Sequence, residues 1–305
     1  MSSILDDLRN EFHKTNNTIV KLIWVNVLVF VSVIVLRVIF HFSNADHIYG
    51  LIMDQLRLPA AFGTFIYKPW TLFTNFFVHE GFLHILFNVL FLYWFGQLLE
   101  EYIGGRRVMA LYILGGLSGG LAFLLMYNLV PYLQTSVASI SLVGASGAVF
   151  AIIVGAATLL PDYTFFLLLL GPVRLKYIAA FYILLSFAEL VGSNAGGNLA
   201  HIAGALVGFG FIKSLQNGID WGTPLYGFLE FFKTLFTARK EPMIPRREKT
   251  ATTIQKYAAQ NISKTSSASA PDQDEIDSIL DKISKSGYES LSREEKQKLY
   301  KASQQ

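Results

Sequence analysis

The chain has 305 residues, of which 52% are hydrophobic and 15% charged, with a net charge of +3 and no cysteine. That much apolar material exceeds the needs of one soluble core, so the composition predicts an all-α, multi-pass membrane protein. The lack of cysteine excludes disulfides, thiolate metal sites and cysteine nucleophiles, and the modest charge gives no reason to expect a nucleic-acid partner.

Six apolar runs, each close to the length of a membrane span, follow a polar N-terminal segment at residues 1–18. They predict a six-transmembrane-helix bundle over residues 19–215. The predicted spans are residues 19–40, 83–99, 108–130, 146–160, 177–191 and 199–215. The shorter run 164–170 precedes Gly171-Pro172 and predicts an interfacial connector, although it could instead lengthen either neighbouring span.

The remainder of the chain predicts three further segments. Residues 216–240 contain an aromatic, amphipathic stretch that favours a helix lying on the cytoplasmic interface, in contact with membrane lipid. Residues 241–272 are rich in Lys, Ser, Thr and Pro and predict a disordered linker. Residues 273–305 predict a small helical hairpin with a cap-like Ser292-Arg293-Glu294-Glu295, and we expect its apolar stripe to bind a cytoplasmic partner.

Lysine and arginine are distributed unevenly between the connections. They occur before the first span, in the second-to-third and fourth-to-fifth connections and after the sixth span. The other side has Arg37, Arg57 and Lys68 around the long first connection, and none in the third-to-fourth and fifth-to-sixth connections. Because positive charge is enriched on the cytoplasmic side, both termini are predicted to be cytoplasmic and spans two, four and six to run inward. We expect an integral protein of the bacterial cytoplasmic (inner) membrane.

Four polar residues share one depth in this topology. His84 and Asn88 lie early in the second span, Ser146 opens the fourth, and His201 lies near the start of the sixth. Polar groups at one depth inside a bundle predict a functional site, although Ser146 alone could be only a small-residue helix contact. A serine hydroxyl needs a base to attack a peptide bond, and we assign that role to His201.

An oxyanion site can be assembled from the same residues. His84 and Asn88 are four residues apart and present two donors on one helix face. The Ser146 N–H, at a helix N-terminus, adds a third donor. The combined pattern predicts cleavage of peptide bonds by a serine nucleophile.

Three spaced motifs carry a resemblance over the predicted core. They are His79-x4-His84-x3-Asn88, Gly144-Ala145-Ser146-Gly147 and Ala200-His201-x-x-Gly204-x-x-x-Gly208. The chain resembles the rhomboid family of intramembrane serine proteases. The resemblance implies a Ser146/His201 dyad without an acidic third member, an oxyanion site from His84, Asn88 and the Ser146 backbone, and a water-filled cavity open to the outside. It also implies substrates that are single-span membrane proteins, cut in or near the membrane.

Two positions depart from the family pattern. Thr71 follows Trp70 where many members have arginine, and Phe150 stands where members often have a tyrosine that stacks on the histidine. A phenyl ring keeps the stacking surface. Gly204 and Gly208 are predicted to be packing residues between spans four and six, and His79 to have a structural or hydrogen-bonding role.

Other chemistries fit less well. His79 and His84 are five residues apart, roughly 140° around a helix, so shared zinc ligation is not expected. We predict no metal and no other cofactor. Glu189 could approach His201, but an interfacial charge reaching water is favoured. The alternative functions are a catalytically inactive rhomboid-like protein that binds membrane clients and, third, a small-solute transporter, which would need paired ionisable residues or broken helices at the midplane.

Overall fold

The computed structural model describes residues 17–167, 171–192, 194–236, 273–286, 291–292 and 294–295. They belong to two separate units, Met1–Thr237 and Ala238–Gln305. Residues 1–16 of the predicted N-terminal segment and the whole predicted linker, residues 241–272, lie outside the described residues. The same holds for residues 237–240, at the end of the predicted interfacial segment.

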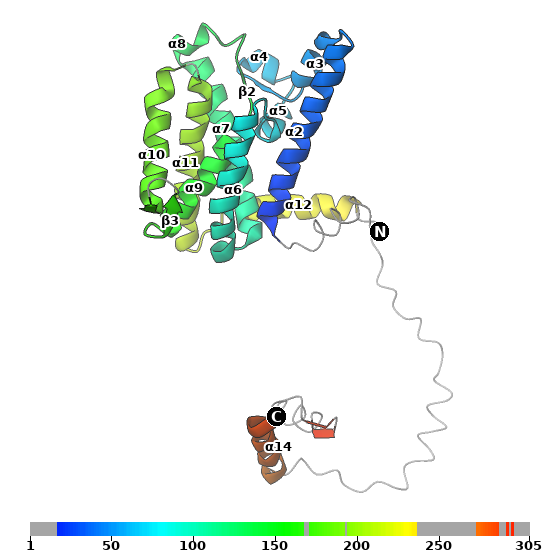
Figure 1. Cartoon of the computed structure of the whole chain (residues 1–305), viewed down its shortest axis with the longest axis vertical. Helices are drawn as coiled ribbons and strands as arrows, with labels where there is room; N and C mark the ends of the chain where they lie inside the picture. Colours follow the sequence, from blue (N-terminus) through cyan, green and yellow to red (C-terminus); the bar gives the residue numbers. More distant parts are fainter. Residues whose placement is uncertain are drawn as a thin grey trace, which may run out of the picture. The chain divides into compact units, whose positions relative to one another are not determined.

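The first unit is a helical bundle in which each predicted span corresponds to one helix (Figure 1). Four helices are long and apolar enough to cross a membrane, which confirms the all-α membrane class. They are α2 (Thr18–Phe42), α6 (Phe82–Ile103), α7 (Gly105–Leu129) and α11 (Ala195–Gln216).

The fourth and fifth predicted spans correspond to shorter helices. α9 (Ser146–Leu159) and α10 (Leu175–Ala188) have 14 residues each, which gives a length of about 21 Å against a hydrocarbon core of about 30 Å. The first residue of α9, Ser146, lines a cavity inside the unit. Among the described residues, four helices therefore have crossing length, and the count of six spans stays a prediction.

The connection between α2 and α6 is folded. It contains α3 (Asp46–Met53), β1 (Leu58–Pro59), α4 (Phe62–Phe65), α5 (Thr71–Thr74) and the 3-10 helix η1 (Asn75–Phe77). After α7 and α8 (Pro131–Gln134), β2 (Ser141–Leu142) pairs antiparallel with β1, with Leu58 opposite Leu142. The first connection therefore holds the strand that leads into α9.

The connector between α9 and α10 is a β-hairpin. β3 (Thr164–Leu167) pairs antiparallel with β4 (Gly171–Arg174), with Thr164 opposite Arg174. Asp162 lies at its base and forms ion pairs with Arg174 and Lys176. The alternative that this run lengthens a neighbouring span is therefore wrong for residues 164–167, because β3 forms its hydrogen bonds with β4 and not along a helix.

α9 is the central helix of the unit, and its residues from Gly147 to Ala157 are all buried. Its closest neighbour is α11. A Cβ atom at Gly204 would overlap the Gly147 carbonyl oxygen, and a Cβ at Gly208 would overlap that of Ala151. The two glycines predicted to be packing residues thus lie where the backbones of α9 and α11 touch.

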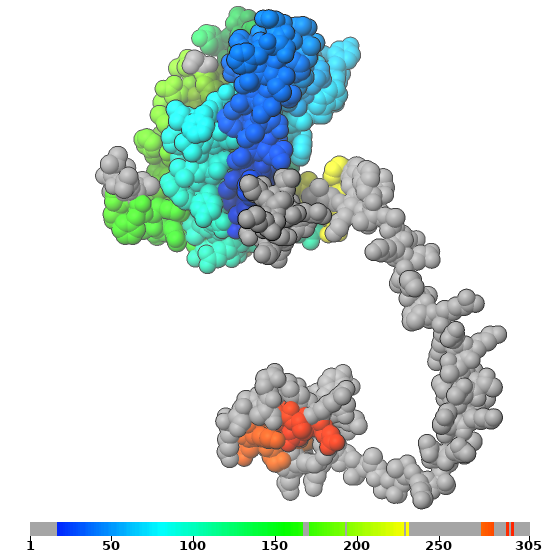
Figure 2. Space-filling view, turned by 45° about the vertical axis from the view of Figure 1, so that its right-hand side comes forward, coloured from blue at the N-terminus to red at the C-terminus, as the bar shows by residue number. Residues whose placement is uncertain are grey.

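α2 lies beside α6 on the outside of the bundle, as the dark blue column and the cyan surface in Figure 2 show. Its N-terminus is capped by a carboxylate from α6. Glu100 accepts hydrogen bonds from the N–H groups of Thr18 at 2.8 Å and Ile19 at 3.1 Å. A negative charge is favoured there because the first N–H groups of a helix have no partner within the helix.

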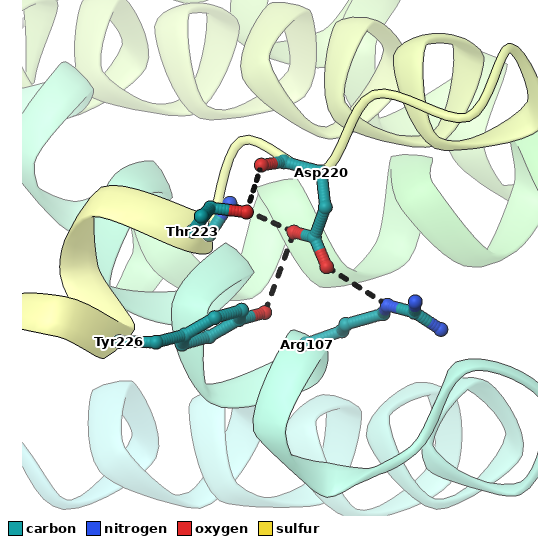
Figure 3. Close-up of polar contacts among 5 residues, drawn as sticks. Arg107, Asp220, Thr223 and Tyr226 are labelled. Atoms are coloured by element: carbon teal, nitrogen blue, oxygen red, sulfur yellow. Dashed lines mark hydrogen bonds and ion pairs between the residues drawn. The ribbon is translucent and has the colours of Figure 1, made fainter. Parts of the chain in front are cut away.

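Two short elements complete the first unit. The 3-10 helix η2 (Glu189–Val191) joins α10 to α11, and α12 (Thr223–Phe236) follows α11. α12 crosses the end of the bundle at which α7 begins (Figure 1). Asp220 fixes it there: its carboxylate accepts from the Arg107 Nε at 3.0 Å and the Gly222 N–H at 2.8 Å, and lies 3.4 Å from the Tyr226 hydroxyl (Figure 3).

The second unit contains α14 (Gln273–Ser286), in which Ile279 is buried. The cap predicted at Ser292 is confirmed. The Ser292 N–H donates to the Glu295 carboxylate at 2.6 Å, and the Glu295 N–H donates to the Ser292 hydroxyl at 3.3 Å. Glu295 also pairs with Lys282 of α14 at 2.9 Å. The remaining residues of the predicted hairpin, including 296–305, lie outside the described part of the chain.

Candidate active site

A cavity of about 1010 Å³ opens between α6, α9, α10 and α11, and residues from all four helices line it. The four polar residues singled out in the sequence, His84, Asn88, Ser146 and His201, are all among its lining residues. Three helices that are far apart in the sequence therefore bring a hydroxyl, an amide and two imidazoles to one space.

Ser146 is the first residue of α9, and the turn before it is held from two sides. The Gly144 N–H donates to the Asn75 carbonyl at 2.9 Å, which links this turn to η1. The Ala145 N–H donates to His79 Nε2 at 3.3 Å, so the hydrogen-bonding role predicted for His79 is confirmed. Because the first N–H groups of α9 have no partner within the helix, they add positive potential beside the Ser146 hydroxyl.

The position of His84 depends on Gly144. That glycine has a φ of +126°, and a Cβ there would come within 2.5 Å of the His84 ring. Glycine is required for both reasons, since L side chains avoid this conformation and the imidazole occupies the space. On α6, Asn88 donates from Nδ2 to the His84 carbonyl at 2.8 Å, which commits one of its two amide N–H bonds and leaves one for the cavity.

His79 and His84 lie closer together than helix geometry suggests. His79 precedes α6, and its ring meets that of His84 edge to face, with 5.1 Å between centroids. The premise that the two imidazoles are 140° apart on one helix was therefore wrong. His79 Nε2 already accepts the Ala145 N–H, and no group of three or more His, Asp or Glu side chains in the described ranges is placed to hold a metal ion.

His201 of α11 contacts two neighbouring helices. Its ring stacks on Phe150 of α9, with 4.2 Å between centroids and 7° between planes. Since residue 150 is one helical turn after residue 146, this contact places the imidazole beside the first turn of α9. Its Nδ1 atom lies 3.0 Å from the Ser186 hydroxyl of α10.

Sequence reasoning missed Ser186. The available signal was a serine among the mostly apolar residues 183–187, fifteen residues before His201. Glu189, the residue considered as a neighbour of His201, is exposed and lines the cavity rim. Its backbone carbonyl accepts from the Asn198 amide at 3.0 Å, which joins η2 to α11.

Thr71, one of the two departures from the family pattern, lies inside the first connection. It is fully buried, and its hydroxyl donates to the Lys68 carbonyl at 2.6 Å. The neighbouring Trp70 donates from its indole nitrogen to the Gln55 carbonyl at 2.9 Å. The residue after Trp70 therefore stabilises the connection itself and does not line the cavity.

Comparison with known proteins agrees with this geometry. A Rhomboid domain model matches residues 67–216, which contain all the cavity residues discussed above, and residues 263–305 match a family of unknown function (DUF6576). The chain is 31% identical over 165 residues to the RHOMBOID-like protein 6, mitochondrial, of Arabidopsis thaliana, which covers 50% of this chain and 47% of that protein.

Two further relatives differ in what their names say. The rhomboid protease GlpG of Haemophilus influenzae is 29% identical over 159 residues, covering 48% of this chain and 71% of that protein. The inactive RHOMBOID-like protein 8 of Arabidopsis thaliana is 27% identical over 103 residues, covering 34% and 27% respectively. The chain spans about half the length of the first plant relatives it matches. From the domain match and these relatives, the chain belongs to the rhomboid family of membrane proteins.

Proposed function

We propose that this protein is an intramembrane serine endopeptidase that cleaves single-span membrane proteins in or near the membrane, with Ser146 as nucleophile and His201 as base. The observation that supports this most directly is the stacking of the His201 ring on Phe150, which is one helical turn after Ser146. Ser146 and His201 both line the cavity. The similarity to a relative named a rhomboid protease adds family-level support.

In the proposed reaction His201 Nε2 takes the proton of the Ser146 hydroxyl as its oxygen attacks the carbonyl carbon of the substrate. The tetrahedral intermediate then collapses, and the imidazolium returns the proton to the leaving amine. Water, activated in the same way, hydrolyses the Ser146 ester. The stacked Phe150 ring restricts the imidazole during both proton transfers, because a ring held face to face cannot tilt.

The oxyanion of the intermediate has three proposed donors. They are the His84 ring, the uncommitted N–H of the Asn88 amide and the Ser146 backbone N–H. Donors held in place before the reaction stabilise developing charge without reorganising, and each typically contributes about 10²–10³ in rate. Gly144 supports this set because it lets the His84 ring lie against the turn that carries the nucleophile.

The remaining assignments extend the proposal to the cell. The Lys/Arg bias supports cytoplasmic termini and a cavity that opens to the outside. The membrane itself is proposed to be a bacterial cytoplasmic membrane. α12, at the opposite end of the bundle, is proposed to contact membrane lipid at the inner interface. The apolar residues of α14 are proposed to recruit a cytoplasmic partner.

The second candidate is a catalytically inactive protein that binds membrane clients, a possibility favoured by the relative named inactive. The two are separated by purifying the full chain, reconstituting it in lipid vesicles with a single-span test substrate and measuring cleavage beside a Ser146→Ala variant. Turnover by the wild type that the variant lacks supports the protease. Client binding by both without cleavage by either would support the inactive alternative.

A further inference from the structure

We propose that Ser186 is a positioning residue for His201: its hydroxyl accepts the Nδ1–H of the imidazole and thereby leaves Nε2 unprotonated and directed at Ser146. The inference rests on the proposed protease function, in which His201 is the base. It adds a third side chain to a pair for which no acidic partner was predicted.

The contact is short and buried. Ser186 lies on α10, has an exposed fraction of 3%, and places its hydroxyl oxygen 3.0 Å from His201 Nδ1. Its neighbours along α10, Leu185 and Phe187, are apolar. A hydroxyl buried in such a helix needs a polar partner, because an unpaired one costs free energy.

Stacking on Phe150 alone does not determine which ring atom faces Ser146. The side-chain torsion χ2 of histidine is broad and roughly two-fold, so a flip of about 180° keeps the ring in the same plane against Phe150. That flip exchanges Nδ1 with a carbon atom. A hydrogen bond donated by the Nδ1–H to the Ser186 hydroxyl oxygen selects one of the two orientations, and Phe150 and Ser186 together therefore determine both the plane and the rotation of the ring.

The proposed direction of this hydrogen bond also specifies the tautomer, because a hydroxyl can donate to a bare Nδ1 or accept from a protonated one. Neutral imidazole has one N–H and one bare nitrogen, and the partner of one nitrogen determines the state of the other. A base that takes the Ser146 proton on Nε2 must carry its own proton on Nδ1, which the Ser186 oxygen can accept. When His201 becomes imidazolium, this bond becomes charge-assisted and strengthens, so it favours the intermediate over the resting state.

A hydroxyl suits this position better than a carboxylate would. A second ion inside the apolar bundle would carry a large desolvation cost, whereas a neutral acceptor orients the ring without it. Glu189, the nearest carboxylate along the chain, is exposed at the cavity rim and forms no described hydrogen bond with the ring.

The first test compares three variants of the full chain in lipid vesicles. Ser186→Ala should lower kcat by roughly 5- to 100-fold with KM unchanged, because it leaves the Nδ1–H unpaired, and Ser186 is only 3% exposed where it lines the cavity. The side chains introduced by Ser186→Thr and Ser186→Val have the same shape and differ only in the hydroxyl. Ser186→Thr should therefore keep kcat near that of the wild type, whereas Ser186→Val should lower it as Ser186→Ala does. Ser118→Ala removes a hydroxyl that bonds only to its own helix, at Gly115, and should leave kcat unchanged.

The second test is independent of cleavage. In protein labelled with 15N-histidine and assigned with a His201→Ala variant, the His201 signals should report a protonated Nδ1 and a bare Nε2, and Ser186→Val should shift them toward the other tautomer. Unchanged signals and unchanged kcat in the folded Ser186→Val variant would overturn the proposal. If the wild type does not cleave but the signals shift as stated, the proposed function fails while the Ser186–His201 pairing stands.

Discussion

Replacing Gly204 with alanine should push α11 away from α9 and slow cleavage about 100-fold. The added Cβ would overlap the Gly147 carbonyl oxygen and lie 2.8 Å from its carbonyl carbon, where an ordinary contact needs 3.4–4 Å. Both atoms belong to backbone, so no flexible side chain can yield and the helices must separate, by roughly 1 Å. A misplacement of that size can cost about 10² in rate, because His201 moves away from Ser146 with its helix.

The same substitution should also destabilise the protein, by about 1–3 kcal/mol, the usual cost of overpacking a well-packed contact. The assay is kcat for a single-span substrate in vesicles, with melting temperature measured on the same preparation. Gly227→Ala is the matched control, because a Cβ at that helical position meets nothing within 4 Å. A folded Gly204→Ala variant with wild-type kcat would refute the claim that this backbone contact sets the distance between nucleophile and base.

Three further predictions concern the cavity, α12 and the topology. Asn88→Ala should lower kcat by about 10²–10³ and leave measurable activity, since His84 and a backbone N–H remain as donors; complete loss in a folded variant would require a larger role for Asn88. Partial burial raises the pKa of Asp220, but its bonds to Arg107 and the Gly222 N–H lower it more, so the net shift is downward. The carboxylate therefore stabilises the fold at pH values above its ordinary pKa, and this effect is lost as the pH falls through the lowered pKa. The melting temperatures of wild type and Asp220→Asn should therefore differ at neutral pH and become equal in acid; a difference that persists in acid would contradict this. In intact cells, cysteine at Ser139 should react with an impermeant thiol reagent, whereas cysteine at Ser266 should react only after the membrane is opened, and the reverse pattern would invert the orientation.

Helices were the part of this fold that could be predicted from sequence, because spans of apolar residues leave few alternatives in a membrane. The start of α9 at Ser146 follows from its small-residue motif, and its end follows from Pro161. The hairpin after it was missed because four-residue strands have too few residues for a clear pattern.

Contacts between segments distant in sequence could not be predicted. The pairing of β1 with β2 and the bond from the Gly144 N–H to the Asn75 carbonyl both depend on how the long first connection folds back over α9. The edge contact of His79 with His84 was misjudged because the angle between them was worked out with helix geometry, although His79 lies before the helix, which begins at Phe82. Ser186 was overlooked because a serine in an apolar helix shows that a polar partner is needed, but not which neighbouring helix supplies it.

The most direct test of Ser146 as an activated nucleophile is labelling of the purified protein by a fluorophosphonate probe, with the modified residue identified by mass spectrometry. Only a serine with a base beside it should react at an appreciable rate. We predict that the probe attaches to Ser146, that Ser146→Ala abolishes labelling, and that His201→Ala nearly does so while both variants stay folded. Equal labelling of wild type and Ser146→Ala, or attachment to a serine outside the cavity, would contradict the proposed mechanism.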